Sequence, residues 1–227
     1  SWLAGATNIS ISKLARGLID EGEWKVLQAA SIERSITPMW IIGHSQMERA
    51  EKRRARPRMT MPDVYNAISM IADGEIDNTK HRIRLIVLDY LQRIRPDPAD
   101  GESKREQMLE AVNKAKDLAL AMSCPVVLGV QAGRQVIDRD DKFPRIDDGQ
   151  ETSNIEQSSD KIFSLWYPSK TEEPGSYVLK SKAVPGGFEV SKNLLLLRVL
   201  KQKLGEAPIT VPLYVNPETN LIGEMTV

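Results

Sequence analysis

The chain has 227 residues with 31 basic and 31 acidic side chains, so its formal net charge is zero. This balance excludes a global positive field, and any contact with nucleic acid must come from local basic patches. A single cysteine, Cys124, excludes an internal disulfide framework and fits a reducing compartment, so we expect a cytoplasmic protein. No apolar run approaches the roughly 20 residues that a membrane helix needs.

The N-terminal part of the chain predicts two helices and a short strand. Ser10 is a suitable cap for the first helix, and a second helix is expected to begin at Glu23. Pro38 ends that helix, and residues 39–42 have the apolar character of a short strand. The core-facing positions expected in the second helix are Trp24, Leu27, Ala30 and Ile32.

Residues 46–58 form a basic run that contains six arginine or lysine side chains against two glutamates. One interpretation is a phosphate-binding patch or a surface for a partner. The other is a solvated helix followed by a loop around Pro57. The residues alone leave both interpretations open.

Two apolar runs, 83–90 and 125–131, are separated by a predicted helix over 104–122. This order predicts a βαβ unit with two parallel strands. A further helix, capped by Thr60, is expected to precede the unit. Each run ends on a polar residue, and ligands of open α/β sheets bind beyond the carboxyl ends of parallel strands.

Asp89 therefore lies where a nucleotide-hydrolysing enzyme holds the water shell of Mg²⁺. An ordinary aspartate at the start of a loop is an equally acceptable interpretation of that stretch alone.

The C-terminal part predicts an antiparallel arrangement after a long polar loop over 132–150. Ser153 is expected to open a short helix, and residues 161–166 to form a strand. Residues 168–192 are rich in turn-forming residues. A strand from residue 193 onward is expected to pair with 209–215 as an antiparallel hairpin.

Four motifs then occur in a recognisable order: Asp-Tyr-Leu-Gln at 89–92, Gln131 with Arg134, Glu-Thr-Ser-Asn-Ile-Glu-Gln at 151–157, and Lys-Gln-Lys-Leu-Gly at 201–205. With them, the chain resembles the C-terminal RecA-like motor domain of the DnaB-type replicative helicases over essentially all of residues 1–227. The resemblance implies one α/β domain. Its sheet would be mostly parallel and flanked by helices, with an antiparallel hairpin at one edge.

The resemblance also implies roles around ATP. Asp89 would bind Mg²⁺ through water, and Gln131 would sense the γ-phosphate. Arg134 would support the following loop or reach a neighbouring subunit. Without the resemblance, Gln131 is interpreted as a capping amide and Arg134 as one half of a surface salt bridge.

Lys201 and Lys203 match a pair of cations that enters the ATP site of the next subunit in the family and neutralises charge during phosphoryl transfer. Lys203 stands where the family has arginine, so the bidentate fork of a guanidinium is missing. Two solvated lysines on an edge strand are the alternative interpretation.

The family's DNA-binding loop matches Gln150, Glu151 and Ser153, and we add Arg145 of the preceding segment. Gln150 replaces the usual arginine and Ser153 the usual glycine, which weakens the electrostatic part of DNA binding. The basic run 46–58 has no counterpart that we assign in the family, and we treat it as an insertion for a loader or for DNA outside the pore.

No Gly-x-x-x-x-Gly-Lys-Ser/Thr motif occurs in the sequence, so we expect a fragment whose phosphate-binding loop and catalytic glutamate lie upstream. The complete protein would use ATP and Mg²⁺ in a homo-oligomeric ring, expected to be a hexamer, on single-stranded DNA, with a primase or helicase loader as a further partner. One alternative is a RecA-like module without ATPase chemistry that serves as a loader or scaffold. Another is a recombinase-like or clock-type ATPase.

Overall fold

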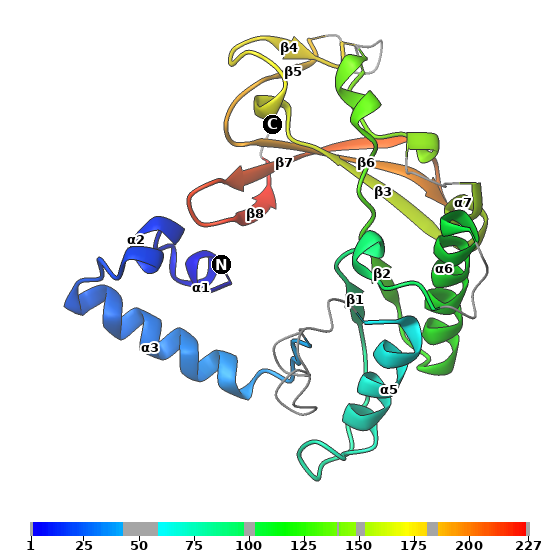
Figure 1. Cartoon of the computed structure of the whole chain (residues 1–227). Helices are drawn as coiled ribbons and strands as arrows, with labels where there is room; N and C mark the ends of the chain where they lie inside the picture. The colour runs from blue at the N-terminus through cyan, green and yellow to red at the C-terminus, as the bar shows by residue number, and fades with distance from the viewer. Residues whose placement is uncertain are drawn as a thin grey trace.

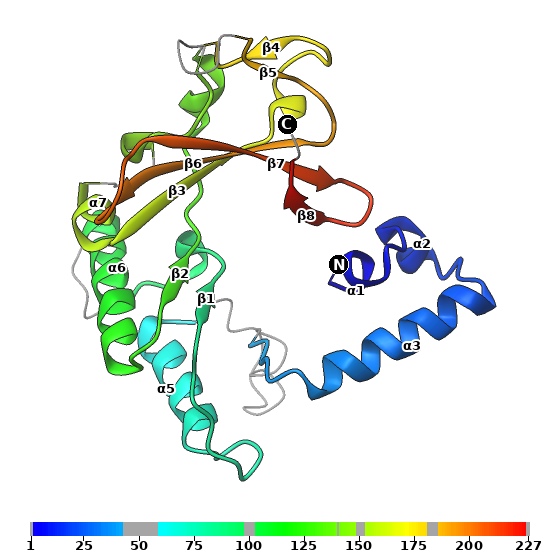
Figure 2. The same cartoon turned by 180° about the vertical axis from the view of Figure 1, so that it is seen from behind.

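The computed structural model describes residues 2–42, 59–97, 103–139, 141–148, 153–180 and 186–225. Helices and both parallel and antiparallel strand pairs are present, which confirms the expected α/β class. Figure 1 shows a parallel strand pair with two helices, an antiparallel sheet above it, and three N-terminal helices to one side. Figure 2 shows the same arrangement from behind. The basic run 46–58 lies outside the described residues.

Three helices form the N-terminal part: α1 (Trp2–Thr7), α2 (Ile11–Arg16) and α3 (Glu21–Ile36). Ser10 caps α2 as expected, because its hydroxyl accepts the backbone N–H of Lys13. A capping box starts α3 two residues before the predicted position: Asp20 and Glu23 each accept a backbone N–H from the other. The N-terminal helices are joined to the C-terminal strands by the N–H of Ile11, which donates to the carbonyl of Glu218 at 2.8 Å.

Helix α3 buries only part of the face that its sequence predicts. Leu27 and Ala30 are buried, whereas Trp24 is 55% exposed and Ile32 is 67% exposed. These two predictions are wrong because α3 packs mainly on the short helix α1, which covers a narrow stripe.

The strand predicted at 39–42 does not form. The carbonyl of Met39 accepts a hydrogen bond from the guanidinium of Arg34 rather than from a neighbouring strand. The ring of Trp40 instead lies edge-on to His81, with 4.4 Å between ring centroids.

Helix α5 (Met61–Ala72) begins where its capping residue predicts. The Thr60 hydroxyl accepts the N–H of Asp63, and the Asp63 carboxylate accepts the N–H of Thr60 at 2.8 Å. This reciprocal pair satisfies two of the four N–H groups that a helix start leaves open. It fixes the helix that covers one face of the parallel strands.

Replacing Thr60 by alanine should lower the free energy of unfolding by about 1 kcal/mol, because the N3 amide loses its acceptor. Urea denaturation of the protein measures this loss. Thr79→Ala is the matched control, since Thr79 lies in an exposed turn where its backbone N–H, not its side chain, bonds to Asp77. An equal loss in both variants would contradict a specific contribution from the cap.

The predicted βαβ unit is present as β1 (Ile86–Leu88), α6 (Lys104–Ala121) and β2 (Val126–Leu128). The strands are parallel, with Ile86 opposite Val126 and Leu88 opposite Leu128. Both strands are three residues long, which is shorter than the apolar runs that predicted them. The short 3-10 helix η1 (Leu91–Arg93) follows β1.

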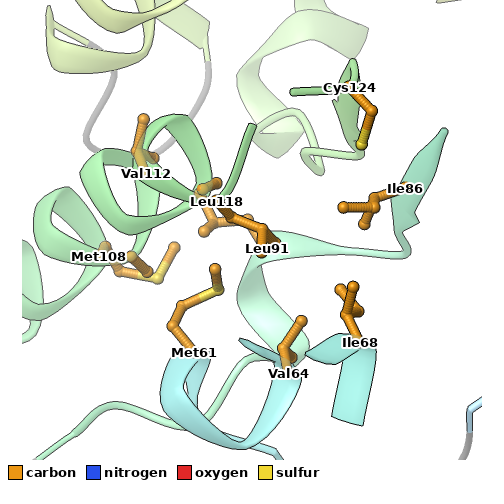
Figure 3. Packing of buried hydrophobic residues seen from close by; sticks show 11 residues of the cluster. Met61, Val64, Ile68, Ile86, Leu91, Met108, Val112, Leu118 and Cys124 are labelled. Carbon is orange, nitrogen blue, oxygen red and sulfur yellow. The ribbon is translucent and has the colours of Figure 1, made fainter. Parts of the chain in front are cut away.

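The main hydrophobic core lies between these strands and helices α5 and α6. Figure 3 shows side chains from both helices, from β1 and from η1 converging on one volume. Leu118 and Leu91 are among its most completely buried members. The core therefore holds the carboxyl ends of β1 and β2 on a packed base. Its buried residues are Met61, Val64, Ile68, Ile86, Leu91, Met108, Ala111, Val112, Ala115, Leu118 and Cys124.

A four-stranded antiparallel sheet follows in the order β3-β6-β7-β8. Its strands are β3 (Lys161–Trp166), β6 (Leu194–Gln202), β7 (Ile209–Asn216) and β8 (Leu221–Glu224). The β6–β7 hairpin confirms the predicted antiparallel edge. The turn-rich excursion contains a small hairpin that the sequence did not predict, β4 (Tyr177–Val178) with β5 (Phe188–Glu189), after the 3-10 helix η5 (Pro168–Lys170).

The parallel share of the strand pairing is smaller than the sequence led us to expect. Among the described residues, β1–β2 is the one parallel pair, and the other pairings are antiparallel. Helix α7 (Ser153–Ser158) has only six residues, and the strand after it pairs with β6 rather than with β2. A parallel connection needs a crossover of a dozen or more residues.

A second core supports the antiparallel sheet. Phe143 is fully buried and meets the ring of Trp166 edge-on, with 5.4 Å between centroids. The guanidinium of Arg198 lies 3.9 Å from the centroid of the Phe143 ring. Leu194 and Leu196 complete this core. None of the described helices combines the length and apolar character needed to cross a membrane.

Candidate functional site at the strand ends and the β6 terminus

Asp89 directly follows β1 at its carboxyl end, and its side chain is exposed. The segment after β2 approaches it closely: a Cβ on Gly129 would lie 3.3 Å from the Cβ of Tyr90 and 3.8 Å from Oδ1 of Asp89. The N–H of Leu91 donates to the carbonyl of Gly129 at 2.8 Å. The strand ends therefore present a solvated carboxylate beside a loop that any larger residue at position 129 would push away.

Gln131 is joined to the Asp89 segment through Gln92. The backbone N–H of Gln131 donates to Oε1 of Gln92 at 3.2 Å, and Nε2 of Gln92 donates to the carbonyl of Gln131 at 3.4 Å. This reciprocal pair fixes the backbone of Gln131 and leaves its side chain exposed. Sequence reasoning assigned no separate role to Gln92; the signal was an amide three residues after the strand-end acid.

The carboxylate at this edge suits Mg²⁺ better than a cation that needs a protein cage. Within the described ranges, no group of three or more His, Cys, Asp or Glu side chains is placed to hold a metal. Mg²⁺ keeps several waters and takes one or two carboxylates together with substrate phosphates. A single strand-end carboxylate such as Asp89 fits that donor set.

Arg134 opens the 3-10 helix η3 (Arg134–Asp138), and its side chain lies outside the described positions. The N–H of Gly133, next to it, donates to the carbonyl of Asp148 at 2.9 Å. That bond holds the start of η3 against the 3-10 helix η4 (Ile146–Asp148). The segment after β2 is thus folded onto itself rather than extended.

Asp148, at the end of η4, is the buried charge of this loop, with 4% of its surface exposed. It forms an ion pair with Arg139 and accepts the backbone N–H of Arg145 at 2.6 Å. Burial acts to raise the pKa of Asp148, but the Arg145 N–H and the Arg139 guanidinium outweigh it, so the pKa is lowered from 3.8. The side chain of Arg145 is exposed.

The folded pKa of Asp148 lies below its unfolded value. The ion pair therefore stabilises the fold above about pH 4, and that contribution is lost as the pH falls through the folded pKa. Asp148→Asn should lower the free energy of unfolding at pH 7 by about 2 kcal/mol. It should also flatten the dependence on pH below 4. Urea denaturation across pH, with exposed Asp147→Asn as the control, measures both effects; matching curves for the two variants would refute the assignment.

Two further ion pairs attach this loop to the antiparallel sheet. Oδ2 of Asp141 lies 3.1 Å from the guanidinium of Arg198 on β6, and Lys142 pairs with Glu172. The loop after β2 therefore spans both parts of the molecule. Movement at the strand end would be transmitted to β6 through these contacts.

Lys201 and Lys203 extend toward the segment that contains α7. The ammonium of Lys201 donates to the carbonyl of Glu156, and that of Lys203 pairs with Asp160. Asp160 also binds Lys116 of α6, at 2.5 Å. The hydrogen bonds from Lys116 and Lys203 hold the pKa of Asp160 at about 2. Figure 1 shows α7 beside α6 at one end of β3 and β6.

The candidate residues thus form two groups. Asp89 and Gln131 share the carboxyl edge of the parallel pair, whereas Lys201 and Lys203 lie with α7 at the end of β6. Ser153 is the first residue of α7. Gln150 and Glu151 fall outside the described residues, so their predicted contact with DNA stays a prediction.

Solved structures match this arrangement over nearly the whole chain. One is described as "The Structure Of A DnaB-Like Replicative Helicase And Its Interactions With Primase"; it has a TM-score of 0.76 and 21% identity, and the match covers 99% of this chain and 46% of that one. The other is described as an ATPase domain, with the same TM-score and identity, and the match covers 99% of this chain and 69% of that one. These likenesses confirm the expected class, a RecA-like helicase ATPase domain.

The sequence comparison gives the family. The chain belongs to the DnaB-like helicase C-terminal domain family, whose sequence model matches residues 2–219. The resemblance inferred from the four motifs is thereby confirmed.

Curated relatives carry the same family name at low identity. Replicative DNA helicase DnaB of Helicobacter pylori is 25% identical over 198 residues, covering 86% of this chain and 36% of that protein. The DnaB of Rickettsia conorii is 28% identical over 149 residues, covering 64% of this chain and 30% of that protein. The chain spans about a third of the length of these relatives, so the family is established at the level of the domain.

Proposed function

We propose that the chain is the motor-domain portion of a ring-shaped replicative helicase that hydrolyses ATP and unwinds duplex DNA. In this proposal it is one RecA-like domain. The observation that carries the proposal is the placement of Asp89 and Gln131 on one strand edge, joined by the Gln92 amide, in a chain of this family. Ligands bind at that edge in α/β sheets.

In the proposed reaction, Asp89 orders the water shell of Mg²⁺ on the β- and γ-phosphates of ATP. Mg²⁺ neutralises charge on the phosphates during transfer. The exposed Gln131 side chain faces the γ-phosphate, and its backbone is tied to Gln92. Loss of that phosphate would then act on the loop 132–148. The phosphate-binding loop and the catalytic glutamate are proposed to come from upstream of Ser1, and alone these 227 residues should hydrolyse ATP poorly.

Lys203 is proposed to act in trans. Its ammonium is exposed at the end of β6, away from the described contacts of Asp89, so a neighbouring subunit of a ring is the natural recipient of its charge. Single-stranded DNA is proposed to contact the segment from Arg145 to Ser153, and a primase or helicase loader to bind the ring. A hexamer in the cytoplasm is the proposed assembly.

Replacing Lys203 by alanine in the full-length protein should lower the kcat for ATP by about 100-fold with a small change in KM, because the cation acts on developing charge. Lys203→Arg should match or exceed wild type, since guanidinium binds phosphate in a bidentate manner. Steady-state ATPase assays with single-stranded DNA measure both variants. Unchanged kcat in Lys203→Ala would refute the trans role.

Unwinding of a forked DNA duplex by the full-length protein tests the proposed function as a whole. We expect unwinding that needs ATP, Mg²⁺ and a free single-stranded tail. The alternative, a RecA-like module that binds DNA or loads a helicase without its own ATPase, is favoured by the lysine at position 203 and predicts DNA binding without unwinding. A recombinase-like ATPase would pair strands instead of separating a fork.

A further inference from the structure

Asp160 occupies an unusual place between the candidate lysines and the body of the domain. One carboxylate oxygen pairs with Lys203 beyond the end of β6, and the other binds Lys116 on α6 at 2.5 Å. The carboxylate thus connects the long core helix to the end of the strand that carries both lysines. These contacts place Asp160 within reach of Lys203 while its own position is set from α6.

A lysine ammonium on a four-carbon stem samples many rotamers when it is exposed. The side chain of Lys203 is 69% exposed, so packing does little to restrict it. Lys116 projects from α6, whose inner face is anchored in the main core. A carboxylate held by Lys116 is therefore a fixed acceptor that selects one orientation of Lys203.

We propose that Asp160 is the positioning residue for Lys203 and orients its ammonium toward the nucleotide of the neighbouring subunit. This inference rests on the proposed function, because it assumes that Lys203 acts in trans. An ammonium has three N–H donors, so a bond to Asp160 leaves two for phosphate oxygens. Asp160 itself does not touch the nucleotide.

Lys201 has a different task in this arrangement. Its ammonium donates to the carbonyl of Glu156, near the end of the six-residue helix α7. The last carbonyls of a helix lack partners within the helix, and a lysine supplies one. Lys201 thus ties β6 to α7, and that tie keeps Lys203 within reach of Asp160.

Asp160→Asn in the full-length protein tests the proposal. Loss of the charge should lower kcat for DNA-stimulated ATP hydrolysis about tenfold and leave KM within about twofold, because misplacing a reacting group reduces rate more than binding. Asp160→Glu should recover much of the loss. The control is Asp117→Asn, which removes an exposed carboxylate from the same helix as Lys116. A kcat that is unchanged or raised in Asp160→Asn would overturn the proposal.

The double variant separates this inference from the proposed function. If Asp160 acts through Lys203, adding Asp160→Asn to Lys203→Ala should cause no further loss of kcat. A full additional tenfold loss would overturn the proposal. If Lys203→Ala alone leaves kcat unchanged, the trans role fails; if it lowers kcat while Asp160→Asn does not, the positioning role alone fails.

A measurement independent of activity completes the test. Acetylation of lysines with a limiting reagent, read by mass spectrometry, reports how well each amine is protected in the assembled protein. In Asp160→Asn, the reactivity of Lys203 and Lys116 should rise severalfold, while that of exposed Lys25 stays constant. Unchanged reactivity of Lys203 would show that Asp160 does not hold it, and would overturn the proposal.

Discussion

Asp89→Asn in the full-length protein should lower DNA-stimulated ATP hydrolysis by about 100-fold or more, because the substituted amide no longer orders the Mg²⁺ water shell. Asparagine has nearly the same shape as aspartate, and Asp89 is exposed, so the fold should be unaffected. Steady-state ATPase assays at saturating Mg²⁺ and single-stranded DNA measure the loss. Circular dichroism of the variant checks that the protein is folded.

The matched control for this variant is Asp73→Asn, which changes an exposed carboxylate at the end of α5, away from the strand edge. It should retain the activity of the wild-type protein. If Asp89→Asn keeps more than about half of the activity, the assignment of Asp89 to Mg²⁺ is wrong.

The largest effect on stability is expected for Leu118→Ala, with a loss of about 3 kcal/mol in the free energy of unfolding. Leu118 is 2% exposed and packs in the main core between α6 and the parallel strands, so its removal leaves a cavity. Urea denaturation of the variant and the wild-type protein measures the difference. The loss should appear in the midpoint of the transition with little change in its slope.

Leu120 offers a control on the same helix, two residues away and 68% exposed. Leu120→Ala removes the same atoms and should change the free energy of unfolding by no more than about 0.5 kcal/mol. Similar losses in the two variants would contradict the position of the core given by the structure.

The carboxyl edge with Asp89 and Gln131 could be predicted from the sequence because its signal is local. Each strand is an apolar run that ends on a polar residue, and a helix of sufficient length joins them in parallel. The Thr60 cap was predictable for the same reason, since both partners of its capping box lie within four residues. Local patterns suffice where local contacts determine the structure.

The features that the sequence did not reveal depend on distant contacts. The pairing of Lys116 with Asp160 joins residues 44 positions apart, and neither residue has a local pattern that indicates the other. The exposed Trp24 and Ile32 follow helical spacing, yet burial depends on how much of α3 its neighbours cover. The antiparallel pairing of β3 with β6 depends on which strand edges lie within reach.

The signals of the proposed site differ in kind. The strand-end acid has a physical rationale in the chemistry of Mg²⁺, so it was found from the residues and the resemblance together. The lysines were found only through the resemblance, because two lysines on a strand are common on protein surfaces. Their contacts with Glu156 and Asp160 supply the physical context that the sequence lacked.

The most direct test of a nucleotide site at this strand edge is a structure of the assembled full-length protein with Mg²⁺ and a non-hydrolysable ATP analogue. We expect a water molecule of the Mg²⁺ shell to donate a hydrogen bond to the Asp89 carboxylate, with Lys203 of the adjacent subunit near the γ-phosphate. A metal and triphosphate bound away from the carboxyl ends of β1 and β2 would contradict this account.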